Sequence, residues 1–182
     1  MDAGLLTSDL ANFCLCLKFT PTIGTSDGMK VSAVFVETST GKFFLCGSFV
    51  EDGVQQRHYT QLETLIAQIR PREIVAEHRG IPQSVVKLIK NILFNPIFSY
   101  LPGKFCTSEA TRAELENKKY FASMPTILTN LAKEDPEAFQ CFGGLVDYLA
   151  CLKLDRVLLS YERILSYSVH EQEKFVEIDG QT

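Results

Sequence analysis

The hydrophobic pattern of this chain changes period near Arg57, and the change restricts the folds that the chain can adopt. Before Arg57, apolar residues form three strand-like runs, Leu10–Phe19, Met29–Glu37 and Lys42–Glu51. Both sides of the first run are mostly apolar, which is typical of a strand covered on two faces. Only Thr38–Gly41 separates the second and third runs, a length that suits a hairpin turn. We therefore predict an antiparallel meander of three strands.

Beyond the meander, apolar residues recur at helical spacing in two segments that alternate with short strands. The first predicted helix stops at Pro71, because proline cannot donate the next backbone hydrogen bond, and the second runs from Pro82 to just before Asn95. Short apolar strands follow the helices at Ile74–Ala76 and Ile97–Leu101. This order favours parallel strands joined by right-handed crossovers, with helices on the sheet faces. The predicted fold class is α/β, with a ribonuclease-H-like mixed five-stranded sheet flanked by helices and followed by a helical appendage.

The helical appendage is predicted from about Ser108 onwards. Thr107 or Ser108 can cap a polar helix, and Asp135 followed by Pro136 can start another. Apolar residues at spacings of three and four give that later helix a continuous seam: Ala138, Phe142, Leu145, Leu149 and Leu152. We place a division between the sheet domain, residues 1–107, and the helices of residues 108–182.

Two adjacent glycines, Gly143 and Gly144, lie inside the helix that Asp135 starts. Glycine in a helix costs about 1 kcal/mol relative to alanine, because it loses more backbone freedom on folding. Close approach of a second helix is a plausible compensation, since only glycine leaves room for it. The pair therefore predicts a tight helix contact at this point.

The net charge of −4 bears on the partners of the chain. A surface that neutralises several phosphates normally carries a basic excess, and this chain as a whole does not. We therefore expect no direct DNA binding by this segment. Basic residues are concentrated only around the second crossover: Arg70, Arg72, Arg79, Lys87 and Lys90. They form either a solvated face or a docking patch for an acidic partner or a neighbouring domain.

Length and composition favour one hydrophobic core in a soluble chain. Its 182 residues are 46% hydrophobic, which is enough to bury one full core. No apolar run approaches the roughly 20 residues of a membrane span, and no secretory signal pattern precedes the first strand, so we expect no secretion. The cysteines lack a C-x-x-C pair and a nearby histidine, and we expect buried, reduced thiols of an intracellular protein. They are Cys14, Cys16, Cys46, Cys106, Cys141 and Cys151.

The sheet raises the question of nuclease activity. Ribonuclease-H-like nucleases hold two metal ions on carboxylates, and the first strand supplies the shared ligand. Here the middle of that strand, Phe13–Leu17, has no carboxylate, although Glu63 and Glu77 could fill two of the other positions. A small ribonuclease-H-like nuclease or resolvase remains the alternative function.

Other catalytic patterns are incomplete. Thr38–Lys42 lacks the earlier glycine and the later hydroxyl residue of a phosphate loop, and it joins two strands. The histidines have no spacing typical of a metal site or a catalytic relay: His58, His78 and His170. We therefore predict no catalytic, cofactor-binding or metal-ligating residues in this chain.

The segment Tyr100–Phe121 orders its apolar and turn residues in an uncommon way. Its landmarks are a strand end, a turn, an aromatic residue, a helix start and an aromatic pair: Leu101, Pro102-Gly103, Phe105, Thr107-Ser108 and Tyr120-Phe121. This order resembles the connector domain of the MutS mismatch-repair ATPases, and within that family the eukaryotic subunit that senses single mismatches in the MutS-alpha heterodimer. Further segments resemble the family in the same order: Val34–Phe44, Gln68–Val75, Phe142–Leu149 and Phe175–Thr182.

The resemblance implies a non-catalytic connector over residues 1–107, followed over residues 108–182 by helices that lead into a lever and core domain. Such a connector joins mismatch binding to an ATPase in other domains of a longer parent chain. The resemblance further implies ATP and magnesium for that parent, a second MutS homologue as heterodimer partner, a MutL-type partner, mismatched DNA bound through the parent, and a nuclear location. It implies no cofactor in this segment.

The end of the chain has a loosely alternating pattern. The apolar residues concerned are Tyr167, Val169, Phe175, Val176 and Ile178. They predict extended segments that lead into a further domain, and an uncovered strand tends to stay mobile or to pair with another molecule. We therefore expect residues after about Leu165 to be poorly packed on their own chain or ordered by a neighbour.

Overall fold

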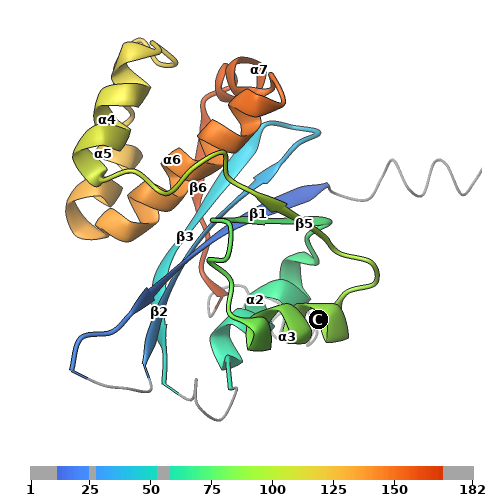
Figure 1. Cartoon of the computed structure of the whole chain (residues 1–182). Coiled ribbons are helices and arrows are strands. Elements are labelled where there is room, and N and C mark those ends of the chain that lie inside the picture. The colour runs from blue at the N-terminus through green and yellow to red at the C-terminus, as the bar shows by residue number, and fades with distance from the viewer. Residues whose placement is uncertain (1–11, 25–27, 53–57, 170–182) are drawn as a thin grey trace, which may run out of the picture.

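A six-stranded mixed sheet forms the middle layer of the molecule (Figure 1). The structure is a computed structural model, and it describes residues 12–24, 28–52 and 58–169. The strands are β1 (Phe13–Pro21), β2 (Met29–Glu37), β3 (Lys42–Glu51), β4 (Glu73–Ala76), β5 (Ile97–Tyr100) and β6 (Arg163–Ser166). They lie in the order β5-β4-β1-β2-β3-β6.

The first three strands form the predicted antiparallel meander. Leu15 of β1 lies opposite Phe35 of β2, and Val36 of β2 lies opposite Phe43 of β3. The turn between β2 and β3 closes where the Gly41 N–H donates to the Glu37 carbonyl at 2.8 Å. Gly41 has a φ of +75°, a conformation that side chains other than glycine seldom adopt. The hairpin prediction for this segment is confirmed.

The next two strands add in parallel, as the strand–helix alternation predicts. β4 pairs with β1, and β5 pairs with β4. Helices α2 (Thr60–Ile69) and α3 (Gln83–Ile92) make the crossovers. α2 ends at Arg70, which takes a left-handed φ of 45° just before Pro71. The predicted mixed α/β fold with flanking helices is therefore confirmed.

Helices cover the opposite face of the sheet after the loop that follows β5 (Figure 1). They are α4 (Ser108–Asn117), α5 (Thr126–Glu134), α6 (Pro136–Cys151) and α7 (Asp155–Leu159). Thr107 caps α4 by accepting the Ala110 N–H, and Asp135 caps α6 by accepting the Ala138 N–H. Both predicted caps are confirmed. Among the described residues, no helix is both long and apolar enough to cross a membrane.

Alternate residues of β1 belong to two hydrophobic cores, one on each face of the sheet. Leu15 and Leu17 pack with α2 and α3, whereas Cys14 and Cys16 pack with α4 to α7. This alternation explains why both sides of the strand are apolar in sequence. The predicted division at residue 107 falls in the loop between the two helical layers, and the helices beyond it share the second core with the sheet.

The sheet has one strand more than the sequence predicts. β6 pairs in parallel with β3, with Ile164 beside Phe43, and the Tyr167 N–H donates to the Leu45 carbonyl at 3.0 Å. The Tyr167 ring lies edge-on to Phe35, at 5.1 Å between centroids. The expectation of poor packing after Leu165 is therefore wrong for Tyr167, because the apolar edge of β3 accepts this segment. Phe175, Val176 and Ile178 lie outside the described residues.

Candidate functional site

α4 and the loop before it approach α6 closely at the glycine pair. A Cβ atom on Gly143 would overlap the Thr111 side chain of α4, and one on Gly144 would overlap the Phe105 ring. Both glycines and Thr111 are buried. The tight helix contact predicted from the sequence is therefore present, with Gly143 required by the approach of α4 and Gly144 by the approach of the Phe105 ring.

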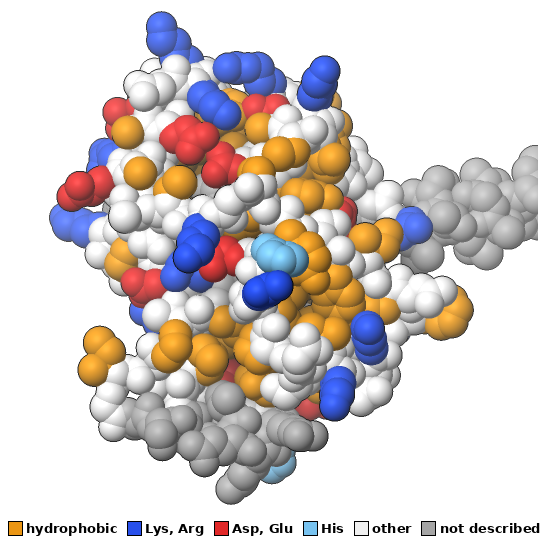
Figure 2. Space-filling view, viewed as in Figure 1, with side chains coloured by type: hydrophobic (Ala, Val, Ile, Leu, Met, Phe, Trp, Pro, Cys, Tyr) orange, Lys and Arg blue, Asp and Glu red, His pale blue; other side chains and the backbone are white. Residues whose placement is uncertain are grey.

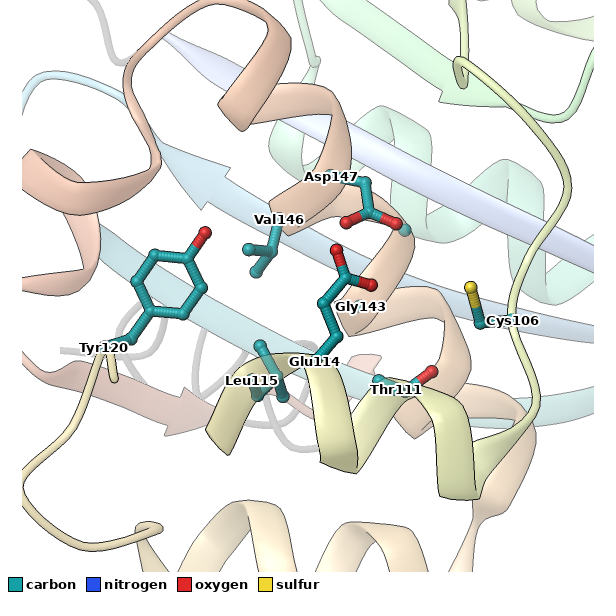
Figure 3. Close-up of a pocket in the computed structure, with 9 residues that line it drawn as sticks. Cys106, Thr111, Glu114, Leu115, Tyr120, Gly143, Val146 and Asp147 are labelled. Atoms are coloured by element: carbon teal, nitrogen blue, oxygen red, sulfur yellow. The ribbon is translucent and has the colours of Figure 1, made fainter. Parts of the chain in front are cut away.

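Three side chains that can donate to a metal ion converge beside this contact (Figure 3). Cys106 comes from the loop before α4, Glu114 from α4 and Asp147 from α6. One ligand atom from each lies within 4.8 Å of the other two. They line a cavity of about 10 Å³ together with Leu115 and Tyr120. A cavity of this size has room for about one water molecule or ion.

One carboxyl group of this cluster, that of Asp147, binds its proton more tightly than usual. Burial, a hydrogen bond with Glu114 and the charge of Glu114 together raise the pKa of Asp147 to about 7, although the charge of Lys118 lowers it. Lys118 Nζ lies 3.5 Å from Glu114 Oε1, so Glu114 already has a cationic partner. Near neutral pH the Asp147 carboxyl is therefore protonated in a large share of molecules, and it can donate to the Glu114 carboxylate.

The thiol of the cluster is a weak nucleophile. Burial raises the pKa of Cys106, and the negative charges of Asp147 and Glu114 raise it further. A thiol in this state stays protonated at neutral pH, whereas the thiolate is the nucleophile and the metal ligand. A metal ion would have to displace protons from Cys106 and Asp147, and it would find three protein ligands where structural zinc sites use four. The raised pKa values of Cys106 and Asp147 therefore oppose metal binding at neutral pH.

Sequence reasoning missed this cluster because its members are far apart in the chain. Residues 106, 114 and 147 come together only when α4 packs on α6. The glycine pair was the one usable signal, since it predicts the helix contact beside which the cluster lies.

α6 is tied to the sheet at both ends by polar contacts. At its start, Asp135 accepts the Ser48 N–H at 2.7 Å and the Ser48 hydroxyl at 2.6 Å. Towards its end, the Tyr148 hydroxyl donates to Glu73 of β4, which also accepts the Ser99 hydroxyl at 2.5 Å. Burial and the hydrogen bond to Glu73 raise the pKa of Tyr148 to about 12. These contacts join α6 to β3 at one end and to β4 and β5 at the other.

Among the described residues, the carboxylates considered for a nuclease, Glu63 and Glu77, belong to no cluster of three potential metal ligands. Glu63 is exposed on α2, and the Glu77 carboxylate accepts the Phe105 N–H at 2.8 Å. A small cavity beside Glu77 is lined by Lys18 of β1, so the first strand contributes a cation there. Two-metal chemistry needs a shared carboxylate at that strand.

The described histidines are exposed, and the cysteines differ in burial. His78 is exposed and contacts the Tyr100 ring edge-on at 5.3 Å, and His58 is exposed. His170 lies outside the described residues. All six cysteines are free, and Cys14, Cys16 and Cys141 are buried. The expectation of burial is wrong for Cys151, which is exposed at the end of α6.

The order of the strands and the helices on both faces define an α/β domain with a ribonuclease-H-like sheet. The family model described as MutS domain II matches residues 12–167, which include β1 to β6 and α2 to α7. The chain therefore belongs to the MutS family.

The mismatch-repair relatives agree with this assignment. The chain is 31% identical to the DNA mismatch repair protein MSH6 of Saccharomyces cerevisiae over 100% of its own length and 16% of that protein. It is 27% identical to the human protein Msh6 over 73% of this chain and 11% of that protein. The chain thus spans less than a fifth of the relatives' length. A fowlpox virus resolvase solved with Holliday junction DNA aligns at 14% identity with a TM-score of 0.37, over 76% of this chain and 98% of the resolvase.

Proposed function

We propose that this chain is the connector of a eukaryotic DNA mismatch-repair protein, and that it couples mismatch binding to an ATPase elsewhere in a longer chain. The observation that carries the proposal is the match to MutS domain II across residues 12–167. The named relatives are mismatch-repair proteins, and the chain aligns with them over 73 to 100% of its own length. The connector itself performs no catalysis in this proposal.

The packing of the chain suits a part that transmits motion. Close-packed layers move as units and pass on a displacement with little internal change. In this chain one sheet carries a fully buried core on each face, and α6 is fixed to β3 through Asp135 and to β4 through Tyr148. A displacement applied at one layer would therefore move the other layer with it.

The partners follow from the same proposal. The parent would bind ATP and magnesium in another domain, pair with a second MutS homologue as in MutS-alpha, and bind mismatched DNA through domains other than this one. A MutL-type protein would be a further partner, and the location would be the nucleus. The net charge of −4 supports the absence of a direct DNA contact through this segment.

The test uses the full-length parent with both ties of α6 removed. In the double variant Asp135→Ala, Tyr148→Phe, we expect mismatch binding to stay unchanged and the stimulation of ATPase activity by mismatched DNA to fall. Tyr161→Phe is the control, because the Tyr161 side chain is exposed and the substitution keeps the ring that stacks with Arg163 and packs beside Gly41. Normal stimulation in a folded double variant would contradict the proposal.

A ribonuclease-H-like nuclease or resolvase is the second candidate, and only the strand order favours it. Lys18 beside Glu77 argues against it, because a cation lies where a shared metal ligand would be needed. Titration of the chain with magnesium or manganese, followed by calorimetry, separates the two candidates. Stoichiometric binding that is lost in Glu77→Gln would favour the nuclease.

A further inference from the structure

The outer edge of β5 has no described strand beside it. β5 ends the sheet order, with β4 on its inner side. The Ile97 N–H donates to the Arg72 carbonyl at 3.1 Å, and the Leu101 N–H donates to the Ala76 carbonyl at 2.9 Å. Backbone groups alternate in direction along a strand, so those of Phe98 and Tyr100 point away from β4. This edge can accept one more short strand.

Apolar side chains flank the edge. Phe94 is 90% exposed, Ile97 is 56% exposed and Tyr100 is 47% exposed. Figure 2 shows apolar side chains gathered around a histidine on the face that carries α3 and β5. Exposed aromatic and aliphatic groups beside a free strand edge are typical of surfaces to which an extended peptide binds.

Cations surround this edge. Lys87 and Lys90 are exposed on α3, and Lys90 Nζ lies 5.9 Å from the centre of the Phe98 ring. Arg72 and Arg79 are exposed at the two ends of β4. Among the described residues, none of these cations forms an ion pair. Lys and Arg groups without a carboxylate partner favour an acidic ligand.

The carboxylates nearest to the edge are already occupied. Glu73 accepts hydrogen bonds from Ser99 and Tyr148, and Glu77 accepts the Phe105 N–H. Both side chains are half-buried. They therefore offset only part of the positive charge that α3 and the ends of β4 present to solvent.

We propose that the outer edge of β5 is the docking site of an extended, acidic segment of a partner protein, which binds by adding a strand to the sheet. Backbone groups of Phe98 and Tyr100 would pair with the segment, Ile97 and Phe94 would contact its apolar residues, and Lys87 and Lys90 its carboxylates. The site goes beyond the connector role and does not rest on it, because binding is measured on this chain alone.

The charges at the edge favour an acidic extended segment over two other occupants, a second copy of the chain and a nucleic acid. A second copy would bring the same cations against the edge, and like charges at a strand edge oppose pairing. Nucleic acid would gain from the cations, but it offers no strand to pair with Phe98 and Tyr100, and the net charge of the chain is −4. An acidic segment in extended conformation uses the backbone, the apolar groups and the cations together.

The experiment measures fluorescence anisotropy of a labelled peptide of about ten residues that alternates glutamate with valine. The protein is the whole chain of 182 residues at physiological ionic strength. We expect Tyr100→Pro to weaken binding about tenfold relative to Tyr100→Ala, because proline removes an outward N–H without removing a bond to β4. Circular dichroism and the melting temperature check that both variants fold.

The charge arm compares two double variants with the same change in net charge. Lys87→Glu, Lys90→Glu should abolish binding, whereas Lys119→Glu, Lys133→Glu on the opposite layer should leave it unchanged. A peptide N-methylated at alternate backbone nitrogens should bind at least tenfold more weakly, and this result does not depend on the folding of a variant.

Four outcomes of the peptide experiments would overturn the proposal. They are no binding of the acidic peptide, equal binding of a peptide with lysine in place of glutamate, equal loss in Tyr100→Ala and Tyr100→Pro with no effect of N-methylation, and displacement of the peptide by a single-stranded oligonucleotide. Sedimentation that shows dimers broken by Tyr100→Pro would assign the edge to a second copy, and would overturn it as well.

Discussion

Asp135 accepts two hydrogen bonds from Ser48, one from its N–H and one from its hydroxyl, and so ties the start of α6 to β3. The same carboxylate caps α6 by accepting the Ala138 N–H at 3.3 Å. Asp135→Ala removes the cap and leaves the Ser48 N–H without its acceptor, while the Ser48 hydroxyl keeps only its contact with the Ser32 hydroxyl at 2.7 Å. We expect a loss of about 2–3 kcal/mol in the free energy of unfolding, measured by urea denaturation.

The control for this prediction is Glu109→Ala, at an exposed position in the first turn of α4. It should change the free energy of unfolding by less than about 0.5 kcal/mol. An equally small change in Asp135→Ala would mean that Ser48 finds another partner.

Gly143→Ala tests the contact between α4 and α6. The added methyl overlaps Thr111 Cγ2, and overpacking of this kind costs about 1–3 kcal/mol, against a gain of about 1 kcal/mol in helix propensity. Thr111→Ser removes only that methyl and keeps the hydroxyl that donates to the Thr107 carbonyl. We therefore expect the double variant to be more stable than Gly143→Ala alone, by thermal denaturation.

Gly103→Ala is the matched control for this pair. No atom lies within 4 Å of a Cβ at that position, so the substitution should be nearly neutral. Additive effects of Gly143→Ala and Thr111→Ser would show that the two side chains do not meet.

The Asp147 carboxyl should make the stability of the chain depend on pH. Its pKa is raised from 3.8 to about 7 in the folded state, mainly by burial. Between these two values the folded chain holds a proton that the unfolded chain has released. The contribution of this carboxyl to the free energy of unfolding is therefore greatest below about pH 4, and it is lost as the pH rises to about 7. The urea midpoint of the unsubstituted chain should fall as the pH rises across this window. Asp147→Asn should flatten this dependence of the midpoint on pH.

The titratable groups near Asp147 are Glu114, Cys106, Lys118 and Tyr120, and of these Glu114 forms the hydrogen bond that raises the pKa of Asp147. Glu114→Gln should therefore flatten the same slope, whereas Glu116→Gln should not, because Glu116 is exposed, lies two residues further along α4 and pairs with Arg112. An unchanged slope in Asp147→Asn would assign the pH dependence to another group.

Zinc should bind weakly to the whole chain. The ion must release protons from Cys106 and Asp147, and it gains three protein ligands. We expect no stoichiometric binding at micromolar zinc near neutral pH by calorimetry, and no rise in melting temperature. Tight binding that Cys106→Ser abolishes would contradict the prediction that the chain has no metal site.

β6 should be protected from hydrogen exchange. The Tyr167 N–H donates to the Leu45 carbonyl, and the Tyr167 hydroxyl donates to Gln68 Oε1 at 2.7 Å. We expect slow exchange at the Tyr167 amide. We also expect Tyr167→Ala to lower the free energy of unfolding by about 3 kcal/mol, because the ring packs against Phe35 and Phe44. Rapid exchange at this amide in a folded sample would restore the expectation that this segment is poorly packed.

Local signals explain why most of the sheet could be predicted. Proline fixed the end of α2 at Pro71, and the change from alternating to helical period near Arg57 separated the meander from the crossovers. β4 and β5 are as short as β6, but each follows a helix that the apolar spacing predicts. β6 begins with Arg163, ends with Ser166 and directly follows no predicted helix, so its strand conformation depends on pairing with β3. Long-range pairing of this kind leaves no local pattern.

The candidate site was harder to predict from the sequence than the sheet. Gly143 and Gly144 indicated a close contact, but nothing in the chain indicated that Thr111 and Phe105 would fill it. Cys106, Glu114 and Asp147 have ordinary sequence neighbours, and their proton sharing arises only from distance and burial in the folded chain.

The two ties of α6 lie on opposite sides of the strand order. Asp135 holds β3, and Tyr148 holds β4, with β1 and β2 between them. The helix contacts all four strands. A change in the twist of the sheet would move β3 and β4 in opposite directions beneath a helix of fixed length, and one of the two ties would have to break. α6 therefore acts as a brace that sets the twist angle of the sheet.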